Sequence, residues 1–448
     1  MSLDAIFKAY DIRGIYPDEI DDDLARRVGN AFARFTGAET VVVGHDMRPS
    51  SPGLAESFTE GATLAGADVV QIGLCSTDVV YFASGRLDVP GAMFTASHNP
   101  AQYNGIKLCR AGAAPVGEDT GLAQIKATVA AGVLEKAAVA GSVTSADMLI
   151  DFGAHVRGFI DPAQLRPLRV VADTANGMGG LVVPIVFDTL PFDLTVLYGE
   201  LDGTFPNHPA DPIQVENLAD LRKAVVDNHA DIGLAFDGDA DRVFLVDDLG
   251  APVSGSTTTS IVAKSILEKH PGESIVHNLI CSRAVPEIVR ENGGTPVRSR
   301  VGHSFIKQVM ADTGAIFGGE HSAHYYFRDF FRADSGMLAA LHVLAALGEQ
   351  DEPLSELMAQ YTRYAASGEV NSTVDDPRAK MAEVEELYGD REDVTTDTLD
   401  GLTVSFANGD WFNLRPSNTE PLLRLNVEAS DAGAVAALRD DVLAVVRR

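Results

Sequence analysis

The chain has 448 residues, of which 46% are hydrophobic, so it can bury several cores and we expect three or four domains. A formal net charge of −29 argues against nucleic acid and anionic membranes as partners, and we interpret it as a contribution to solubility. The longest apolar runs, 181–187 and 337–347, are well short of the roughly 18 residues that span a bilayer.

Cysteine usage and the first residues indicate the compartment. The three cysteines, Cys75, Cys109 and Cys281, have no metal-binding spacing and leave an odd count, which favours a reducing environment. Charged residues such as Lys8 and Asp11 interrupt any apolar core of a signal peptide. We therefore expect a cytoplasmic protein.

The first third of the chain shows alternating strand and helix patterns. Ser50, Ser51 and Pro52 supply the cap and first turn of one helix. We predict strands at 39–44, 68–73 and 91–96, and helices at 51–66, 120–132 and near 147–161.

The same alternation then restarts twice. The second block has strands at 168–173, 194–198, 231–236 and 243–247, with helices at 176–190 and 214–229. The third block has strands at 274–279, 296–299 and 314–318, with helices at 256–269, 284–292, 303–312 and 334–347. Such βα units predict three doubly wound α/β domains with mixed sheets.

From about residue 366 the pattern changes. Strands are predicted at 368–374, 402–406, 410–415 and 422–428, with helices at 376–389 and 431–446. This order favours a smaller C-terminal α+β domain.

Ser97 follows the apolar stretch VPGAMF and lies in the segment TASHNP (95–100). A serine that carries a phosphoryl group needs a strand end, room for a tetrahedral group and nearby donors. His98 and Asn99 are suitable donors, and the setting is not the GxSxG elbow of hydrolases. Taken alone, the segment could also be an ordinary polar turn.

Asp237, Asp239 and Asp241 alternate in the segment DGDADR (237–242). Alternate residues of an extended loop point the same way, so three carboxylates can converge on one hard divalent cation. An EF-hand is excluded, because its sixth position would be Arg242 instead of glycine and its flanks are strands. The open ligand set favours Mg²⁺, although a solvated acidic turn stays possible at this point. Arg242 could be a counter-ion or could bind a phosphate through a bidentate fork.

Two further polar loops complete the set. In GEHSAH (319–324), Glu320 and Ser322 would share one face and could hold neighbouring sugar hydroxyls, while His324 could act as an acid or base. The loop RPSNTEP (415–421) begins with Arg415 and is followed by Arg424, which favours a phosphate site. It lacks the Walker spacing, and without context a polar hairpin loop is an equal alternative.

In combination and order, these motifs resemble those of the α-D-phosphohexomutase family over essentially the whole chain. Within that family, GEHSAHYYFRDF and YAASGEVN (364–371) resemble the bacterial phosphomannomutase or phosphomannomutase/phosphoglucomutase group. The segments that carry the resemblance are FKAYDIRG (7–14), GHDMRPSSP (44–52), TASHNP (95–100), DGDADR (237–242), VGHSFIK (301–307), GEHSAHYYFRD (319–329) and RPSNTEP (415–421).

The resemblance implies four domains around a central cleft, each contributing one loop: a phosphoserine domain (1–150), a metal-binding domain (151–254), a sugar-recognition domain (255–365) and a C-terminal phosphate-binding domain (366–448). It implies that Ser97 is the phosphoserine and that one Mg²⁺ is bound by Asp237, Asp239, Asp241 and Ser97. Residues that would shape charge or proton transfer are Arg13, Lys107, Arg242, His303 and His324. Substrate would be held by Glu320, Ser322, Arg415, Ser417, Asn418 and Thr419.

The implied activity is interconversion of mannose 6-phosphate and mannose 1-phosphate, with glucose phosphates as further substrates, through a hexose 1,6-bisphosphate that also serves as activator. The implied partners are small hexose phosphates, with the chain as a monomer or homodimer and without nucleic acid or membrane. Phosphoglucosamine mutase is the alternative within the family. Outside it, a phosphatase that releases the phosphoserine phosphate to water and a non-catalytic sugar-phosphate sensor are the other candidates.

Overall fold

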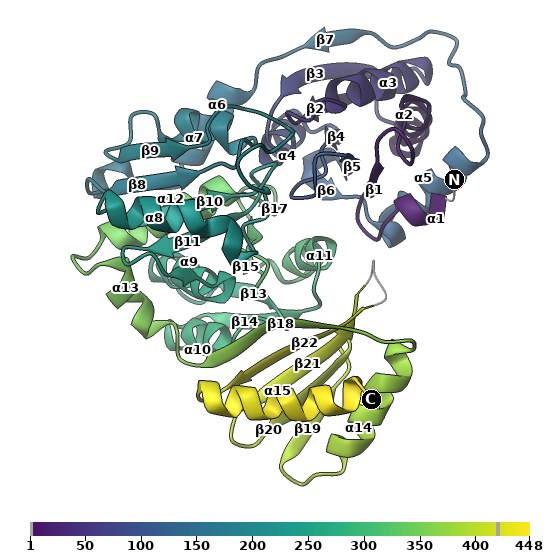
Figure 1. Cartoon of the computed structure of the whole chain (residues 1–448). Helices are drawn as coiled ribbons and strands as arrows, with labels where there is room; N and C mark the ends of the chain where they lie inside the picture. The colour runs from purple at the N-terminus through teal and green to yellow at the C-terminus, as the bar shows by residue number, and fades with distance from the viewer. Residues whose placement is uncertain (1–2, 418–421) are drawn as a thin grey trace.

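The computed structural model describes residues 3–417 and 422–448, which form four sheets with their flanking helices (Figure 1). The first sheet is mixed, with strand order β1-β5-β4-β2-β3-β7 and β6 paired to β5. Its centre is the buried β-branched run Val41–Val43, as expected for parallel strands covered on both faces. The strands are β1 (Ile12–Ile15), β2 (Thr40–His45), β3 (Asp68–Leu74), β4 (Gly91–Phe94), β5 (Tyr103–Arg110), β6 (Ala114–Pro115) and β7 (Val143–Ser145).

Helices accompany the first sheet and lead to the second. They are α1 (Leu3–Ile6), α2 (Asp22–Thr36), α3 (Ser51–Leu64), α4 (Thr77–Leu87), α5 (Leu122–Ala130) and α6 (Leu149–Arg157). The sequence patterns did not predict α2 or α4, although α2 begins with a capping bond from the Leu24 N–H to the Asp21 carboxylate.

The second and third sheets have five strands each and mix parallel with antiparallel pairs. In the second, β12-β11-β10-β8-β9, the strands are β8 (Arg169–Asp173), β9 (Asp193–Leu197), β10 (Ile232–Phe236), β11 (Val243–Asp247) and β12 (Pro252–Val253), with helices α7 (Gly179–Phe187) and α8 (Ala219–Asp227). In the third, β14-β13-β15-β16-β17, they are β13 (Ser274–Asn278), β14 (Thr295–Ser299), β15 (Phe317–Gly319), β16 (Tyr325–Phe327) and β17 (Ala333–Asp334). Its helices are α9 (Gly255–Lys269), α10 (Ala284–Glu291), α11 (His303–Thr313), α12 (Gly336–Gly348) and α13 (Leu354–Leu357).

The fourth sheet is antiparallel throughout, with strand order β18-β22-β21-β20-β19. Its elements are β18 (Ala365–Thr373), α14 (Pro377–Gly389), β19 (Val394–Asp397), β20 (Leu402–Phe406), β21 (Trp411–Pro416), β22 (Leu422–Ala429) and α15 (Ala432–Val446). The expected class, three mixed α/β units followed by a smaller α+β unit, is confirmed.

The hydrophobic cores are not divided evenly among the sheets. One continuous cluster runs from Val79 and Phe82 of α4 through the second sheet to Leu344 of α12. The fourth sheet has a separate cluster, which includes Phe412, Leu425 and Val442. Of the helices that the described residues form, none combines the length and hydropathy needed to cross a bilayer.

Buried histidine gives this fold a defined sensitivity to acid. His277 on β13 is 6% exposed, its ring nitrogen Nδ1 lies 3.1 Å from the Asn278 carbonyl, and burial lowers its pKa to about 4. The unfolded chain therefore takes up a proton near pH 6.5 that the folded chain excludes. The contribution of His277 to the free energy of unfolding is therefore fully present above pH 6.5 and is lost as the pH falls toward 4.

We expect His277→Gln to remove up to about 3 kcal/mol of this pH dependence between pH 7.5 and 4.5. The measurement is denaturant unfolding of the wild type and the variant at several pH values. The exposed His229→Gln is the matched control and should follow the wild type. Equal slopes for the wild type and His277→Gln would contradict the assignment.

Candidate active site

Ser97 lies in a tight turn beyond β4. The strand ends at Phe94, before the predicted 96, because the Thr95 hydroxyl accepts the Ser97 N–H at 2.9 Å and closes the turn. Ser97 has φ of 51° in the left-handed region, a strained conformation that is concentrated at functional sites. Its Oγ donates to Oδ2 of Asp237 at 2.7 Å and lies 3.2 Å from Nδ1 of His98.

Arg48 holds the Ser97 turn in place and was not identified as a site residue from the sequence. Its guanidinium is fully buried and donates to four backbone carbonyls, those of Ser97 at 2.9 Å, Asn99 at 2.6 Å, Pro100 at 2.8 Å and Tyr103 at 3.0 Å. Asp46, also fully buried, balances the charge with an oxygen 3.2 Å from Nε. The available signal was an arginine before proline, in the segment GHDMRPSSP.

The three aspartates lie in the turn between β10 and β11, where this turn contacts the Ser97 turn. A Cβ added to Gly238 would lie 2.3 Å from the Ser97 carbonyl oxygen, so only glycine permits this approach. Asp237, Asp239 and Asp241 are each at most 1% exposed, and their oxygens gather within 4.8 Å of one another. Ser97 follows a strand of the first sheet, and the aspartates lie in the second. The packing of these two sheets brings Ser97 into contact with Asp237, 140 residues away in the sequence.

The hydrogen bonds of this cluster leave acceptors for a cation. Lys107 donates from Nζ to Oδ2 of Asp239 at 2.7 Å and to Oδ2 of Asp241 at 2.6 Å. The Oδ1 atoms of Asp239 and Asp241 are buried and have no hydrogen-bond partner among the described residues. Lys107 and Arg242 together balance only two of the three carboxylates, so both the charge and the hard oxygen donors fit Mg²⁺.

Burial and neighbouring charges separate the pKa values of the aspartates. Burial raises the pKa of Asp237, and Asp239 and Asp241 add to this, while Arg242 opposes it. Burial alone would also raise the pKa of Asp239, but the Lys107 ammonium and the Thr77 hydroxyl bring it below the ordinary value. Asp239 is therefore ionised at neutral pH, as a metal ligand must be.

Arg242 contacts the serine directly, whereas Arg13 contacts the nearby Asn99 and pairs with Asp11. Arg242 donates to Oδ2 of Asp237 from Nε at 2.9 Å and from Nη2 at 2.8 Å, and its Nη2 lies 3.3 Å from the Ser97 Oγ. Arg13 donates to Oδ1 of Asn99 at 2.6 Å. Burial, with Arg242 and Arg13, lowers the pKa of His98 well below its ordinary value, so this imidazole is neutral.

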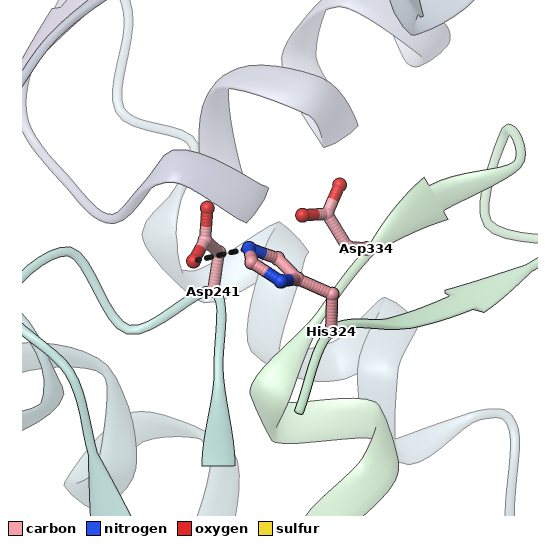
Figure 2. A group of neighbouring side chains, drawn as sticks. All are labelled: Asp241, His324 and Asp334. Atoms are coloured by element: carbon pink, nitrogen blue, oxygen red, sulfur yellow. Dashed lines mark ion pairs between the residues drawn. The ribbon is translucent and has the colours of Figure 1, made fainter. Parts of the chain in front are cut away.

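His324 lies beside two carboxylates, those of Asp241 and Asp334, as Figure 2 shows. Its Nε2 is 3.9 Å from Oδ1 of Asp241, and its Nδ1 is 3.3 Å from the Ser322 hydroxyl. These three residues form a second group with metal-ligand spacing, but Lys307 already pairs with Asp334 at 2.8 Å. The group of Asp237, Asp239 and Asp241 offers three carboxylates, whereas this second group offers two carboxylates and an imidazole.

One cavity of about 680 Å³ is lined by all six residues predicted to be catalytic. His303 lies in it with Tyr10, whose ring is 4.9 Å away, and burial beside Lys307 lowers the pKa of His303 well below its ordinary value. The predicted residues that line this cavity are Ser97, Arg13, Lys107, Asp241, Arg242, His303 and His324. The predicted residues in the described part of the chain that do not line it are Asp237, Asp239, Glu320, Ser322, Arg415 and Ser417.

Glu320 is buried and fixed by three donors. Its Oε1 accepts the Tyr326 hydroxyl at 2.5 Å, and its Oε2 accepts from Asn278 and from the Gly302 N–H, both at 3.1 Å. This carboxylate is therefore held rigidly near the loop that begins α11.

Arg415 and Arg424 face each other across β21 and β22 and share one carboxylate, Glu369. Arg415 donates to it at 2.8 Å, Arg424 lies 3.3 Å from its other oxygen, and Arg424 donates to the Ser417 hydroxyl at 3.2 Å. Guanidinium groups bind phosphate oxygens through charge-assisted hydrogen bonds, and Arg424 also reaches the cavity of Ser97. Asn418 and Thr419 lie outside the described residues.

Comparison with known proteins identifies the family and the fold. Four family models match in succession: the phosphoglucomutase/phosphomannomutase α/β/α domains I, II and III over residues 4–135, 150–250 and 254–364, and the C-terminal domain over 369–445. A protein of Xanthomonas campestris pv. campestris named phosphohexose mutases is 43% identical over 446 residues, covering 98% of each chain. A phosphomannomutase of Salmonella typhimurium is 42% identical over 433 residues, covering 94% of each chain.

A crystal structure of a phosphoglucomutase/phosphomannomutase family protein from Burkholderia thailandensis has a TM-score of 0.90 and 32% identity, covering 100% of this chain and 98% of the other. The fold and site thus define an isomerase that works by phosphoryl transfer, a phosphohexomutase. The chain belongs to the phosphoglucomutase/phosphomannomutase family. The resemblance seen in the sequence motifs is confirmed.

Proposed function

We propose that this chain is a phosphomannomutase, which interconverts mannose 6-phosphate and mannose 1-phosphate and also accepts glucose phosphates. The observation that carries the proposal is Ser97 Oγ, 2.7 Å from Asp237 and 3.3 Å from Arg242, in a cavity lined by Arg13, Lys107 and further polar side chains. The curated relatives that cover nearly the whole chain and are named phosphomannomutase support the choice of sugar.

Ser97 carries the phosphoryl group in this proposal. The hexose phosphate hydroxyl forms a bond to phosphorus as the bond from phosphorus to Ser97 Oγ breaks, which gives a hexose 1,6-bisphosphate. After the bisphosphate turns around, Ser97 Oγ attacks its other phosphoryl group, and the product hydroxyl leaves. Holding the intermediate in the cavity makes the second transfer effectively intramolecular, with effective molarities up to about 10⁵–10⁸ M for ideal alignment.

The charged groups of the site stabilise the phosphoryl group in transit. Arg13 and Arg242 neutralise its oxygens, while Lys107 keeps two carboxylates in place. Mg²⁺, held by Asp237, Asp239, Asp241 and the Ser97 phosphate, would offset the charge of the phosphate. His324, with an acceptor or donor nitrogen near Asp241, exchanges the hydroxyl proton, and the neutral His303 is the second candidate for this role.

Substrate recognition is assigned to the third and fourth sheets. Glu320 and Ser322 bind the sugar hydroxyls, using lone pairs that their protein donors leave available. Arg415 and Ser417, with Asn418 and Thr419 of the same loop, bind the phosphate that is not being transferred. We also propose that the phosphoserine, metal-binding, sugar-recognition and phosphate-binding domains span residues 1–150, 151–254, 255–365 and 366–448.

The remaining assignments follow from this activity. The chain binds one Mg²⁺, uses a hexose 1,6-bisphosphate as activator, and acts in the cytoplasm on small hexose phosphates as a monomer or homodimer without nucleic acid or membrane. Phosphoglucosamine mutase, the alternative left by the motifs, is not favoured by the names of the relatives that cover the whole chain.

A coupled assay with mannose 1-phosphate, glucose 1-phosphate and glucosamine 1-phosphate tests the proposal. We expect the largest kcat/KM for mannose 1-phosphate, a smaller value for glucose 1-phosphate and dependence on both Mg²⁺ and a hexose 1,6-bisphosphate. Preference for glucosamine 1-phosphate would overturn the choice of sugar. Steady release of inorganic phosphate without isomerisation would indicate a phosphatase instead, and binding without turnover would indicate a sensor.

A further inference from the structure

The first turn of α4, a helix of the first sheet, contacts loops of the second and third sheets. Thr77 begins this helix, and its N–H donates to the Asp239 carbonyl at 3.2 Å, which joins the helix to the metal loop of the second sheet. Asp78, the next residue, accepts the Ser335 hydroxyl at 2.7 Å, and Ser335 caps α12 of the third sheet. Thr77, Asp78 and Ser335 are all fully buried.

The Thr77 hydroxyl determines which Asp239 oxygen is available. It donates to Oδ2 at 2.5 Å, the same oxygen that accepts from Lys107 at 2.7 Å. Two donors on Oδ2 leave Oδ1 as the buried atom without a hydrogen-bond partner in the described part of the chain. Hydrogen bonds to the oxygen of a metal-binding carboxylate that does not face the metal fix the rotation of that carboxylate. Their loss typically lowers metal affinity about 10–100-fold.

The opposite side of the same turn is equally well fixed. Ser76 donates to one oxygen of Asp78, and Ser335 donates to the other. One turn farther along α4, the Tyr81 ring lies 4.1 Å from the Lys307 ammonium, which pairs with Asp334 at 2.8 Å. On α12, a Cβ at Gly336 would lie 2.8 Å from the Arg242 backbone, so this helix also packs directly against the metal loop.

We propose that Thr77 is a positioning residue for the metal ligand Asp239, and that Asp78 and Ser335 anchor the helix turn that presents it. Nothing in the phosphoryl-transfer scheme requires Thr77 to touch substrate, since it acts only through Asp239. The inference rests on the proposed cation site of Asp237, Asp239 and Asp241.

The test is the affinity for Mg²⁺, measured by calorimetry on the full chain without substrate. Thr77→Val removes the hydroxyl at nearly constant shape and should weaken Mg²⁺ binding about 10-fold or more, whereas Thr77→Ser should stay within about threefold of the wild type. Ser335→Ala should weaken binding by less than Thr77→Val, because it loosens the turn without removing the bond to Asp239. Thr128→Val on α5, which also loses a threonine hydroxyl, is the control and should bind as the wild type does.

Activity gives a second readout. The Thr77→Val rate should recover at high Mg²⁺, because the lost quantity is metal affinity, while a general loss of folding would not be rescued. Mg²⁺ affinity within twofold of the wild type would overturn the positioning role. If Thr77→Val does not fold, Thr77→Ala and Thr77→Ser are compared in its place, and equal affinities in that pair would overturn the role. Absence of Mg²⁺ binding by the wild type would instead overturn the cation site itself.

Discussion

Ser97→Ala is expected to lower the rate of isomerisation by at least about a thousandfold, even with a hexose 1,6-bisphosphate present. Without Oγ, no phosphoryl group can be held between the two transfers, and neither Asp237 nor Arg242 can replace it as a carrier. The rate is measured by the coupled assay with mannose 1-phosphate. Intact mass spectrometry after incubation with bisphosphate should show one added phosphoryl group on the wild type and none on the variant.

Alanine at this position keeps the backbone N–H that binds Thr95 and removes only the hydroxyl contacts. The variant should therefore fold, and its thermal midpoint should stay close to that of the wild type. Ser145→Ala, an exposed serine on β7, is the matched control and should retain both rate and phosphorylation. Full activity of Ser97→Ala would reject the phosphoserine mechanism, while leaving the family assignment intact.

Arg48→Met is expected to destabilise the protein by at least about 3 kcal/mol and to reduce the activity of the folded fraction about 100-fold. Removing the guanidinium leaves Asp46 as a buried charge without its counter-ion, a loss that typically costs about 3–5 kcal/mol. The four carbonyls of the Ser97 turn also lose their donor, so Oγ is no longer held against Asp237. Denaturant unfolding and the coupled assay measure the two effects separately.

Arg48→Lys distinguishes charge from geometry. It retains the positive charge beside Asp46, but one ammonium cannot serve four carbonyls and a carboxylate in the arrangement of the guanidinium fork. We expect a smaller loss of stability than for Arg48→Met, with most of the activity still lost. Arg27→Met, at a partly exposed ion pair with Asp23, is the control and should be nearly neutral. Wild-type activity of Arg48→Lys would show that Arg48 does not position the turn.

The sequence patterns were most informative where local chemistry is strong. The buried strands around DGDADR were predicted to within a residue, because an apolar run bounded by acidic turns has few other interpretations. The helix α4 was not predicted, although its N-terminus binds Asp239. Its sequence, TDVVYFASGRL, has three β-branched residues in its first turn and is buried on every side from Thr77 to Ser84, so it lacks the amphipathic period that marks a helix.

The sequence likewise predicted only part of the candidate site. Motif chemistry indicated Ser97 and the aspartates, but no local pattern could show that Arg48 donates to four carbonyls 49 to 55 residues farther along the chain. Thr77 and Asp239 lie 162 residues apart, and only the packing of two sheets brings them together. Such long-range contacts depend on the tertiary structure, so residue spacing in the sequence does not predict them.

The separate core of the fourth sheet has a consequence for the free energy of domain movement. Contacts from the third sheet to the fourth include the exposed ion pair between Arg298 and Asp397 and two backbone N–H groups, Arg283 to Glu428 and Val301 to Asp400. Exposed ion pairs of this kind contribute about 0–1 kcal/mol each, whereas opening a shared apolar core would cost about 25 cal/mol for every Å² exposed. Separating the fourth sheet from the third would therefore break polar contacts without opening a shared apolar core, whereas separating Ser97 from the aspartates would open the large continuous cluster.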